Sequence, residues 1–164
     1  MSEDLLVRAC RVDDAAVLRD VRLEALRDTP DAFGSTFGDA VTWPAERWVA
    51  MATDWNFYLG YHDGRPAGMA SGGRHEHYPG THWLYGMYVT PGARGTGLAD
   101  ALVEAVSAWA RTEGGAALYL HVTESVARAR RFYEKIGFVP TDEVTPMSRD
   151  SSLQLMTMVK HFES

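Results

Sequence analysis

Short runs of apolar residues, alternating or continuous, predict strands in several parts of the chain. The predicted strands, in chain order, are 5–10, 56–61, 66–72, 83–89, 118–122 and a last strand that contains Leu153, Leu155 and Met158. Asp63-Gly64 lies between the second and third runs. Because Asp-Gly favours a tight hairpin turn, we expect these two strands to pair antiparallel.

Apolar residues at spacings of three and four predict helices between the strands. The first predicted helix begins at an N-cap, Asp13 or Asp14, and reaches about Arg27. The second covers 44–52 and the third covers 98–111. The fourth begins after an N-cap at Ser125. Segment 28–42 contains Pro30, Gly34 and Gly38, and segment 141–150 is polar, so both predict loops. This order of strands and helices predicts an α+β domain with a mixed sheet.

A Gly-rich turn, Arg94 to Ala99, joins the strand 83–89 to the helix that begins near Gly97. Gly95 and Gly97 permit backbone conformations that are closed to residues with a Cβ atom. The free N–H groups of the helix's first turn lie at the positive end of its dipole, so we expect an anion, a phosphate, to bind there. The turn lacks the Lys-Ser/Thr of a P-loop and the third glycine of a dinucleotide fingerprint.

The pattern Arg-x-x-Gly-x-Ala in this turn resembles the acetyl-CoA pyrophosphate loop of the GNAT superfamily of N-acetyltransferases, whose usual form is Gln/Arg-x-x-Gly-x-Gly/Ala. A second match is the segment 132–138, FYEKIGF, which is similar to the Tyr-Glu-Lys-x-Gly-Phe segment that ends a later helix in the family. The predicted strand 118–122 separates the two motifs, as in the family. The resemblance is close over 84–138 and looser over the whole chain.

The resemblance implies a GNAT-like fold, with a mixed and mostly antiparallel sheet flanked by helices, and an N-acetyltransferase that uses acetyl-CoA as its acyl-donor cosubstrate. In the family, two central strands part and the pantetheine arm lies between them. The main chain that would bind pantetheine here is that of Met87, Tyr88 and Val89. The N–H groups that would bind the pyrophosphate are those of Arg94, Gly95, Thr96, Gly97, Leu98 and Ala99. Gly86 would either mark a bulge in its strand or permit close packing.

Tyr133 stands where the family usually supplies the proton donor to the departing thiolate, and we expect it to be catalytic. An amine with a pKa of about 10 must lose a proton before it attacks, so a base or a water chain is also needed. The strand 83–89 contains no acid, although many relatives carry a glutamate there. The base is left open among His121, His82, Glu24 and Glu46. The residues expected to line the acceptor pocket are Phe33, Tyr85 and His121, although Phe33 is also an expected core anchor.

Two departures from the family pattern keep an alternative open. One is the missing strand glutamate, and the other is Val126, which stands where the family often has an Asn that bonds the cofactor arm. The leading interpretation is direct transfer of an acetyl group to the amine of a small molecule, peptide or protein. The alternative is a non-catalytic acyl-CoA-binding or regulatory module.

Composition limits the class of protein. A chain of 164 residues that is 46% hydrophobic has enough apolar material for one domain, which we expect to span 1–164. The net charge of -6 argues against nucleic-acid binding. No apolar run is long enough to span a bilayer and the first residues do not form a signal sequence, so we expect a cytoplasmic protein with no membrane partner. Exposed edge strands and the aromatic content favour a homodimer.

Two further groups of residues are expected to carry no chemistry. Cys10 is the only cysteine and is expected to be a buried, inert thiol. His75 and His77 share one face of any strand, as metal ligands often do, with His82 nearby. Because Pro79-Gly80 indicates a turn, we expect these histidines to surround an exposed hairpin and to bind no metal.

Overall fold

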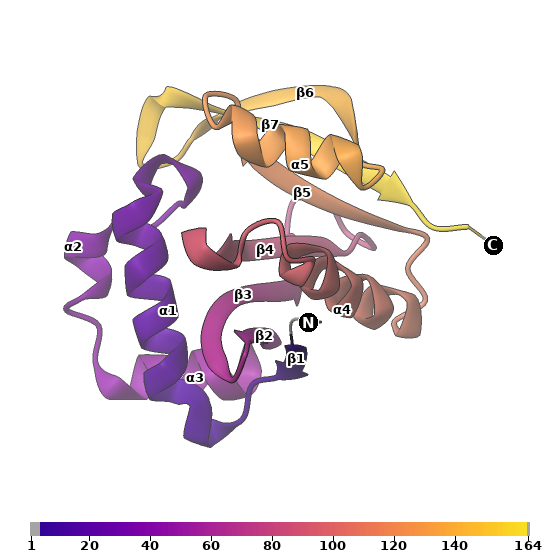
Figure 1. The fold of residues 1–164 in the computed structure, drawn as a ribbon. Helices are drawn as coiled ribbons and strands as arrows, with labels where there is room; N and C mark the ends of the chain where they lie inside the picture. Colours follow the sequence, from indigo (N-terminus) through magenta and orange to yellow (C-terminus); the bar gives the residue numbers. More distant parts are fainter. Residues whose placement is uncertain (1–3, 164) are drawn as a thin grey trace.

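The computed structural model describes residues 4–163, which form a seven-stranded sheet flanked by helices (Figure 1). The strands are β1 Leu5–Ala9, β2 Phe57–His62, β3 Arg65–Gly73, β4 Trp83–Val89, β5 Ala117–Thr123, β6 Val139–Met147 and β7 Asp150–His161. Their order across the sheet is β1-β2-β3-β4-β5-β7-β6, and each neighbouring pair is antiparallel except β4 and β5. This confirms the predicted α+β class and its mixed, mostly antiparallel sheet.

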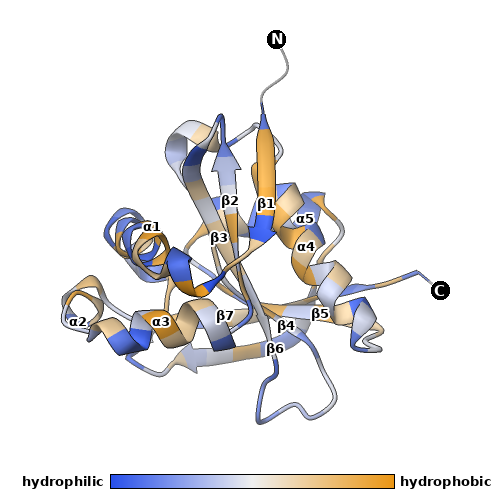
Figure 2. Ribbon diagram, turned by 90° about the horizontal axis from the view of Figure 1, so that it is seen from below, coloured by the Kyte–Doolittle hydropathy of each residue, from blue (hydrophilic) through white to orange (hydrophobic). Residues whose placement is uncertain are grey.

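Helices cover both faces of the sheet, and each face has its own apolar core (Figure 2). The helices are α1 Ala15–Asp28, α2 Phe37–Ala40, α3 Ala45–Asp54, α4 Leu98–Thr112 and α5 Ala127–Lys135. The core on the side of α1 and α3 includes Leu18, Met51 and Leu59. The core on the side of α4 and α5 includes Leu102 and Leu118. Among residues 4–163, no helix is both long and apolar enough to cross a membrane.

The prediction of a polar loop over 141–150 is wrong. Most of that segment belongs to β6, and its last residue starts β7. β6 lies at the edge of the sheet, beside β7, and four of its nine residues are polar, namely Thr141, Asp142, Glu143 and Thr145. An edge strand also tolerates Pro140 and Pro146, because a missing N–H on its free side breaks no ladder bond. These features give β6 the composition of a loop.

The predicted helix caps are also partly wrong. α5 has Val126 rather than Ser125 at its N-cap position, with no side-chain hydrogen bond. Asp14 does stand at the N-cap of α1, but its carboxylate accepts hydrogen bonds from the Arg8 guanidinium at 2.6 and 2.8 Å instead of capping the helix. The hydrogen bond from Arg8 is the main reason that the pKa of Asp14 is lowered to about 2. Asp14 therefore fastens β1 to the start of α1.

The FYEKIGF segment forms the end of α5 and the turn that follows it. The N–H of Phe138 donates to the Tyr133 carbonyl at 3.0 Å, and the N–H of Gly137 donates to the Glu134 carbonyl at 3.2 Å. Gly137 adopts a left-handed φ of 105°. This is a Schellman motif, in which glycine ends a helix and the next residue packs back on it. The rings of Tyr133 and Phe138 lie 5.6 Å apart, so the turn fixes the position of Tyr133.

Replacing Gly137 by Ala is therefore expected to destabilise the protein by about 1–2 kcal/mol, because a Cβ atom disfavours the left-handed conformation. That Cβ would also lie 3.3 Å from Lys160 Cε. The free energy of unfolding, measured by urea denaturation, checks this. Gly38→Ala is the control, because nothing lies within 4 Å of a Cβ there and the backbone is helical. Equal stability of the two variants would contradict the role assigned to Gly137.

β4 and β5 are paired over only a short length and then part from each other (Figure 1). The register pairs Trp83 with Tyr119 and Leu84 with Leu120, and no later residue of β4 is paired with β5. A bulge follows on the other edge of β4, because Tyr85 faces Ser71 whereas Tyr88 faces Met69. Gly86 lies in this bulge with a φ of 59°. Of its two predicted roles, a bulge or close packing, the structure thus shows the bulge.

Candidate active site

A cavity of about 720 Å³ lies at the opening between β4 and β5. Residues from both faces of the sheet line it: Val126, Ala129 and Tyr133 come from the α5 side, whereas Arg22, Phe33 and Met51 come from the α1 and α3 side. The cavity therefore passes through the sheet where the two strands part. Tyr133 and the three predicted pocket residues Phe33, Tyr85 and His121 all lie in its wall.

Tyr133 is the only buried residue of α5 and is 7% exposed. Its ring packs between those of Phe132 and Phe138, with centroids 5.3 and 5.6 Å away. Burial raises the pKa of the Tyr133 hydroxyl above its ordinary value. The hydroxyl is therefore protonated at neutral pH, which is the state that a proton donor needs.

His121 enters the cavity from β5, on the face opposite to Leu118 and Leu120. Its ring lies 4.7 Å from that of Trp83 and 5.7 Å from that of His75. Its Nε2 atom is buried and has no hydrogen-bond partner within residues 4–163. Burial, and then the nearby His75, lower the pKa of His121, so its imidazole is neutral at pH 7 and able to accept a proton.

The other three candidates for the base lie outside the cavity wall. His82 is 4% exposed and packs against Trp109, with ring centroids 5.3 Å apart. Glu24 and Glu46 are exposed on α1 and α3. Of the four candidates, the structure thus brings only His121 to the cavity.

Phe33 and Tyr85 line the side of the cavity away from α5. Phe33 is 6% exposed and belongs to the core beneath α1, so it both anchors its loop and borders the cavity. Its carbonyl accepts hydrogen bonds from the Arg149 guanidinium at 3.0 and 3.1 Å, which ties the loop to the turn between β6 and β7. Tyr85 is partly exposed, and its hydroxyl donates to the Arg74 carbonyl at 3.3 Å. Burial raises the pKa of Tyr85 to about 12.

The Gly-rich turn after β4 adopts the conformation that its glycines permit. Gly95 and Gly97 have φ values of 82° and 98°, and Gly97 is the N-cap of α4. The Thr96 hydroxyl donates to the Ala93 carbonyl at 2.6 Å and accepts from the Leu98 N–H at 3.3 Å. The Arg94 N–H donates to the Pro91 carbonyl at 3.3 Å. These bonds hold the turn in place.

Four of the six N–H groups in the predicted anion site have no acceptor within the described part of the chain. They are those of Gly95, Thr96, Gly97 and Ala99. Unpaired N–H groups at the start of a 15-residue helix form a site that suits a phosphate group. The pyrophosphate of acetyl-CoA therefore fits the residues that are present.

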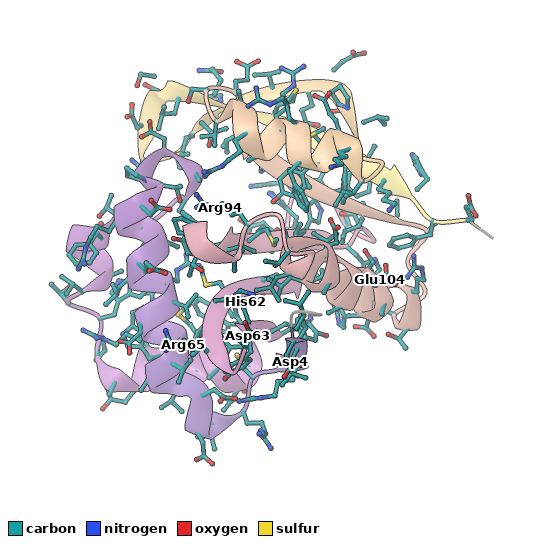
Figure 3. All side chains as sticks on the ribbon, viewed as in Figure 1. Asp4, His62, Asp63, Arg65, Arg94 and Glu104 are labelled. Atoms are coloured by element: carbon teal, nitrogen blue, oxygen red, sulfur yellow. The ribbon has the colours of Figure 1, made fainter. Side chains whose placement is uncertain are left out.

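The Arg94 side chain connects this turn to α1 (Figure 3). Its Nη2 donates to Asp28 Oδ2 at 2.8 Å, and its Nε donates to the Val89 carbonyl at 3.1 Å. The Tyr88 hydroxyl donates to the same Asp28 oxygen at 3.0 Å. Arg94 first, and Tyr88 after it, lower the pKa of Asp28. This cluster fixes the position of the turn relative to the strand that precedes it.

The ladder between β3 and β4 decides which main-chain groups of β4 face the opening. The Thr90 N–H donates to the Ala67 carbonyl at 2.8 Å. Since hydrogen-bonded pairs alternate along an antiparallel ladder, Tyr88 also directs its main chain to β3, whereas Val89 directs its main chain toward β5. Arg94 already occupies the Val89 carbonyl. Met87 lies beside the bulge at Gly86, and of the three predicted pantetheine residues it is the one that lines the cavity.

Arg22 lines the cavity and was not among the residues predicted from the sequence. One sequence signal was available, because Arg22 is four residues after Leu18 and four before Leu26, both fully buried. A charged residue at helical spacing between two core residues lies at the border of the apolar stripe. Val126, which replaces the family's Asn, also lines the cavity.

Within residues 4–163, no group of three or more His, Cys, Asp or Glu side chains is placed to hold a metal ion. His75 and His77 have ring centroids 5.6 Å apart, whereas His82 packs on Trp109. Cys10 is half-buried, and burial is the main cause that raises the pKa of its thiol to about 12. A thiol with that pKa is a poor nucleophile at neutral pH.

A sheet that opens between its parallel strands, with a turn of unpaired N–H groups and a tyrosine beside the opening, is the architecture of acyl-CoA-dependent acetyltransferases. The chain belongs to the acetyltransferase (GNAT) family, whose model matches residues 21–138.

Solved structures share the fold of this chain, and a curated relative matches part of its sequence. An acetyltransferase structure from Salmonella typhimurium with its cofactor acetyl-CoA is 20% identical, covers 98% of this chain and 95% of that chain, and has a TM-score of 0.77. An acetyltransferase of the GNAT family from Streptococcus pneumoniae is 22% identical, with coverage of 98% and 100% and a TM-score of 0.77. An uncharacterized N-acetyltransferase of Mycobacterium tuberculosis is 44% identical over 52 residues, which are 32% of this chain and 33% of that relative. The chain thus matches about a third of the length of its curated relatives.

Proposed function

We propose that the protein transfers an acetyl group from acetyl-CoA to the amine of an acceptor by direct attack on the thioester. The observation that carries this proposal is the cavity through the sheet, which has Tyr133 on one side and His121 on the other. The free N–H groups of the turn before α4 and membership of the GNAT family support it. Acetyl-CoA supplies the activated carbonyl group.

The residues of the chain have distinct tasks in this proposal. Gly95, Thr96, Gly97 and Ala99 bind the pyrophosphate through their N–H groups, and the main chain of Met87 orients the pantetheine arm. The neutral imidazole of His121 accepts a proton from the acceptor's ammonium group, directly or through a water molecule. The protonated hydroxyl of Tyr133 donates its proton to the sulfur that leaves.

Thiol release in the presence of acetyl-CoA and single amines tests this function. The acceptors to be compared are free amino acids, polyamines and the amino termini of peptides. Thiol release that depends on one class of amine supports the proposal. Binding of acetyl-CoA with no release for any amine would favour the alternative, a non-catalytic acyl-CoA-binding or regulatory module, for which the replacement of the family's Asn by Val126 is the specific observation.

The pH profile of the wild type is expected to fall on the acid side, because the imidazole of His121 must be neutral to accept a proton. Its pKa is lowered, so kcat/KM is retained above the ordinary value of about 6.5 and declines only below it. His121→Gln is expected to reduce kcat/KM at pH 7 by about 100-fold and to remove this acid limb. His77→Gln is the control, since His77 is exposed and outside the cavity wall. An unchanged acid limb in His121→Gln would show that another group is the base.

We further propose that residues 1–164 act as one domain in the cytoplasm and bind neither nucleic acid nor a membrane. One continuous sheet from Leu5 to His161 supports a single domain. The single cysteine allows no internal disulfide, and the net charge of -6 disfavours nucleic-acid binding.

The unpaired edges of β1 and β6 support a homodimer, which analytical ultracentrifugation would detect.

A further inference from the structure

Arg22 is a cation without a partner in the wall of the cavity. Its Nε atom is buried and has no hydrogen-bond acceptor within residues 4–163. No carboxylate of the described chain forms an ion pair with its guanidinium. The Arg22 guanidinium makes a cation–π contact with the Phe33 ring, whose centroid lies 5.6 Å from Arg22 Cζ.

The Arg22 side chain as a whole is half-buried, and the cost falls on its shielded Nε, from which water has been removed without a hydrogen bond in return. Burial is the main cause that lowers the pKa of Arg22 to about 10, and the positive charge of Arg47 adds to it. The guanidinium nevertheless stays charged at neutral pH. An arginine that only filled space here would be better replaced by a methionine, so its charge calls for a functional explanation.

The other charged groups of the cavity wall do not neutralise Arg22. Asp54 lines the cavity but is exposed and forms no ion pair among the described residues. Arg74 is a second cation in the wall, and its Nη2 lies 3.9 Å from the carboxylate of Glu113. Within residues 4–163, neither of these two groups therefore balances the charge of Arg22.

Arg22 also lies where an acceptor has to bind. A Cβ atom at Gly86 would be 3.2 Å from Arg22 Nη1, so the guanidinium lies over the bulge at which β4 turns away from β5. Met87, the next residue, lines the same cavity. The glycine at position 86 leaves room beside the guanidinium, on the opposite side of the sheet from α5. His121 and Phe33 border this side as well.

We propose that Arg22 binds a carboxylate of the acceptor, so that the natural acceptor is a small amine that also carries a carboxylate, such as an amino acid. This inference rests on the proposed acetyltransferase function. A guanidinium offers parallel N–H donors that match the two oxygens of a carboxylate, and such a pair is strong in a site with little water. A bound carboxylate would supply the acceptor that Arg22 lacks and would hold the amine end of the molecule at a fixed distance from it.

The test compares matched acceptors and matched variants. Each of the twenty amino acids is compared with its amide, which keeps the amine and side chain but has no negative charge, by thiol release with acetyl-CoA. The variants are Arg22→Met, Arg22→Lys and Arg19→Met. Arg19 is the control because it lies on the same helix but outside the cavity wall, with its Nη1 atom 3.8 Å from Asp20 Oδ1.

At least one amino acid is expected to be acetylated with a kcat/KM about 100-fold above that of its amide. Arg22→Met is expected to remove this preference, because it slows acetylation of the amino acid and not of its amide. Arg22→Lys is expected to restore part of the preference, and Arg19→Met to leave it unchanged. Arg22→Met is also expected to unfold at no lower urea concentration than the wild type, since it removes a charge without a partner. A clear loss of stability in Arg22→Met would instead assign Arg22 a structural role and overturn the inference.

Two further outcomes separate this inference from the proposed function. Acetylation of polyamines, amides or peptides with no activity on any amino acid would overturn the role of Arg22 and leave the acetyltransferase function standing. Phosphoethanolamine is the probe for an amine that carries a phosphate. Preference for it over amino acids would mean that Arg22 binds a phosphate, and would overturn the proposal that it binds a carboxylate. Absence of acetyl-CoA binding would remove the function itself, and the inference with it.

Discussion

The Tyr133→Phe variant is expected to lose most of its acetyl transfer while it binds acetyl-CoA as tightly as the wild type. The substitution removes only the hydroxyl, and the ring keeps its contacts with Phe132 and Phe138. Without a proton donor, the sulfur must leave as a thiolate. Loss of a general acid typically costs about 10²- to 10⁴-fold in rate, and we expect kcat to fall within this range.

The measurement is kcat from thiol release, together with the acetyl-CoA dissociation constant from calorimetry. Tyr119→Phe is the matched control, because Tyr119 lies on β5 beside Trp83, with stacked rings 5.4 Å apart, and outside the cavity that holds Tyr133. It is expected to keep the rate of the wild type. Normal turnover in Tyr133→Phe would rule out Tyr133 as the sole proton donor.

Gly97→Asp is expected to abolish acetyl-CoA binding although the protein remains folded. Gly97 has a φ of 98°, a conformation that Asp and Asn tolerate better than other residues with side chains. Asp is also a favoured N-cap, and a negative charge at this end of α4 stabilises the helix. The same charge repels a pyrophosphate bound to the N–H groups around it. Strain at a φ of 98° offsets this gain, so the affinity for acetyl-CoA is expected to fall far more than the stability of the protein.

Gly97→Asn separates the charge from the shape of the new side chain, because Asn and Asp have nearly the same size and backbone preferences. We expect the affinity for acetyl-CoA to be at least about tenfold lower in Gly97→Asp than in Gly97→Asn, which corresponds to about 1.4 kcal/mol. Calorimetric titration of both variants measures it. Equal affinity in the two variants would mean that the pyrophosphate lies elsewhere.

The parts of the fold that the sequence predicts are those decided by local backbone chemistry. Asp63 and Gly64 both have positive φ values, 51° and 81°, which a hairpin of this kind needs, and the strands beside them pair as expected. Gly137 ends α5, and Gly95 and Gly97 form the turn before α4. In each case a glycine or an aspartate signals a conformation that few other residues adopt.

The parts that the sequence does not predict depend on neighbours that are distant along the chain. β6 is a strand because β7 pairs with it, and its own residues carry two prolines and several polar groups. Ser125 is a good capping residue by type, yet the chain enters α5 through Val126. These outcomes are set by tertiary packing, which overrides local preference.

The candidate site divides in the same way. Tyr133 and the anion turn belong to continuous motifs, so their positions in the sequence indicate their roles. His121 and Arg22 come from different elements, β5 and α1, and neither has a motif around it. Only the fold brings them to one cavity. The chemistry proposed for the acceptor pocket is therefore inferred from the buried, unpaired nitrogen atoms of these two side chains and not from sequence patterns.

The most direct test of this account is calorimetric titration of the wild-type protein with acetyl-CoA, with ATP and NAD as controls. The account predicts saturable binding of acetyl-CoA at one site per chain and no comparable binding of either nucleotide, because the turn at Gly95–Ala99 and the cavity through the sheet act together on one elongated molecule. No binding of acetyl-CoA by a folded sample, or equal binding of all three compounds, would contradict the proposed function.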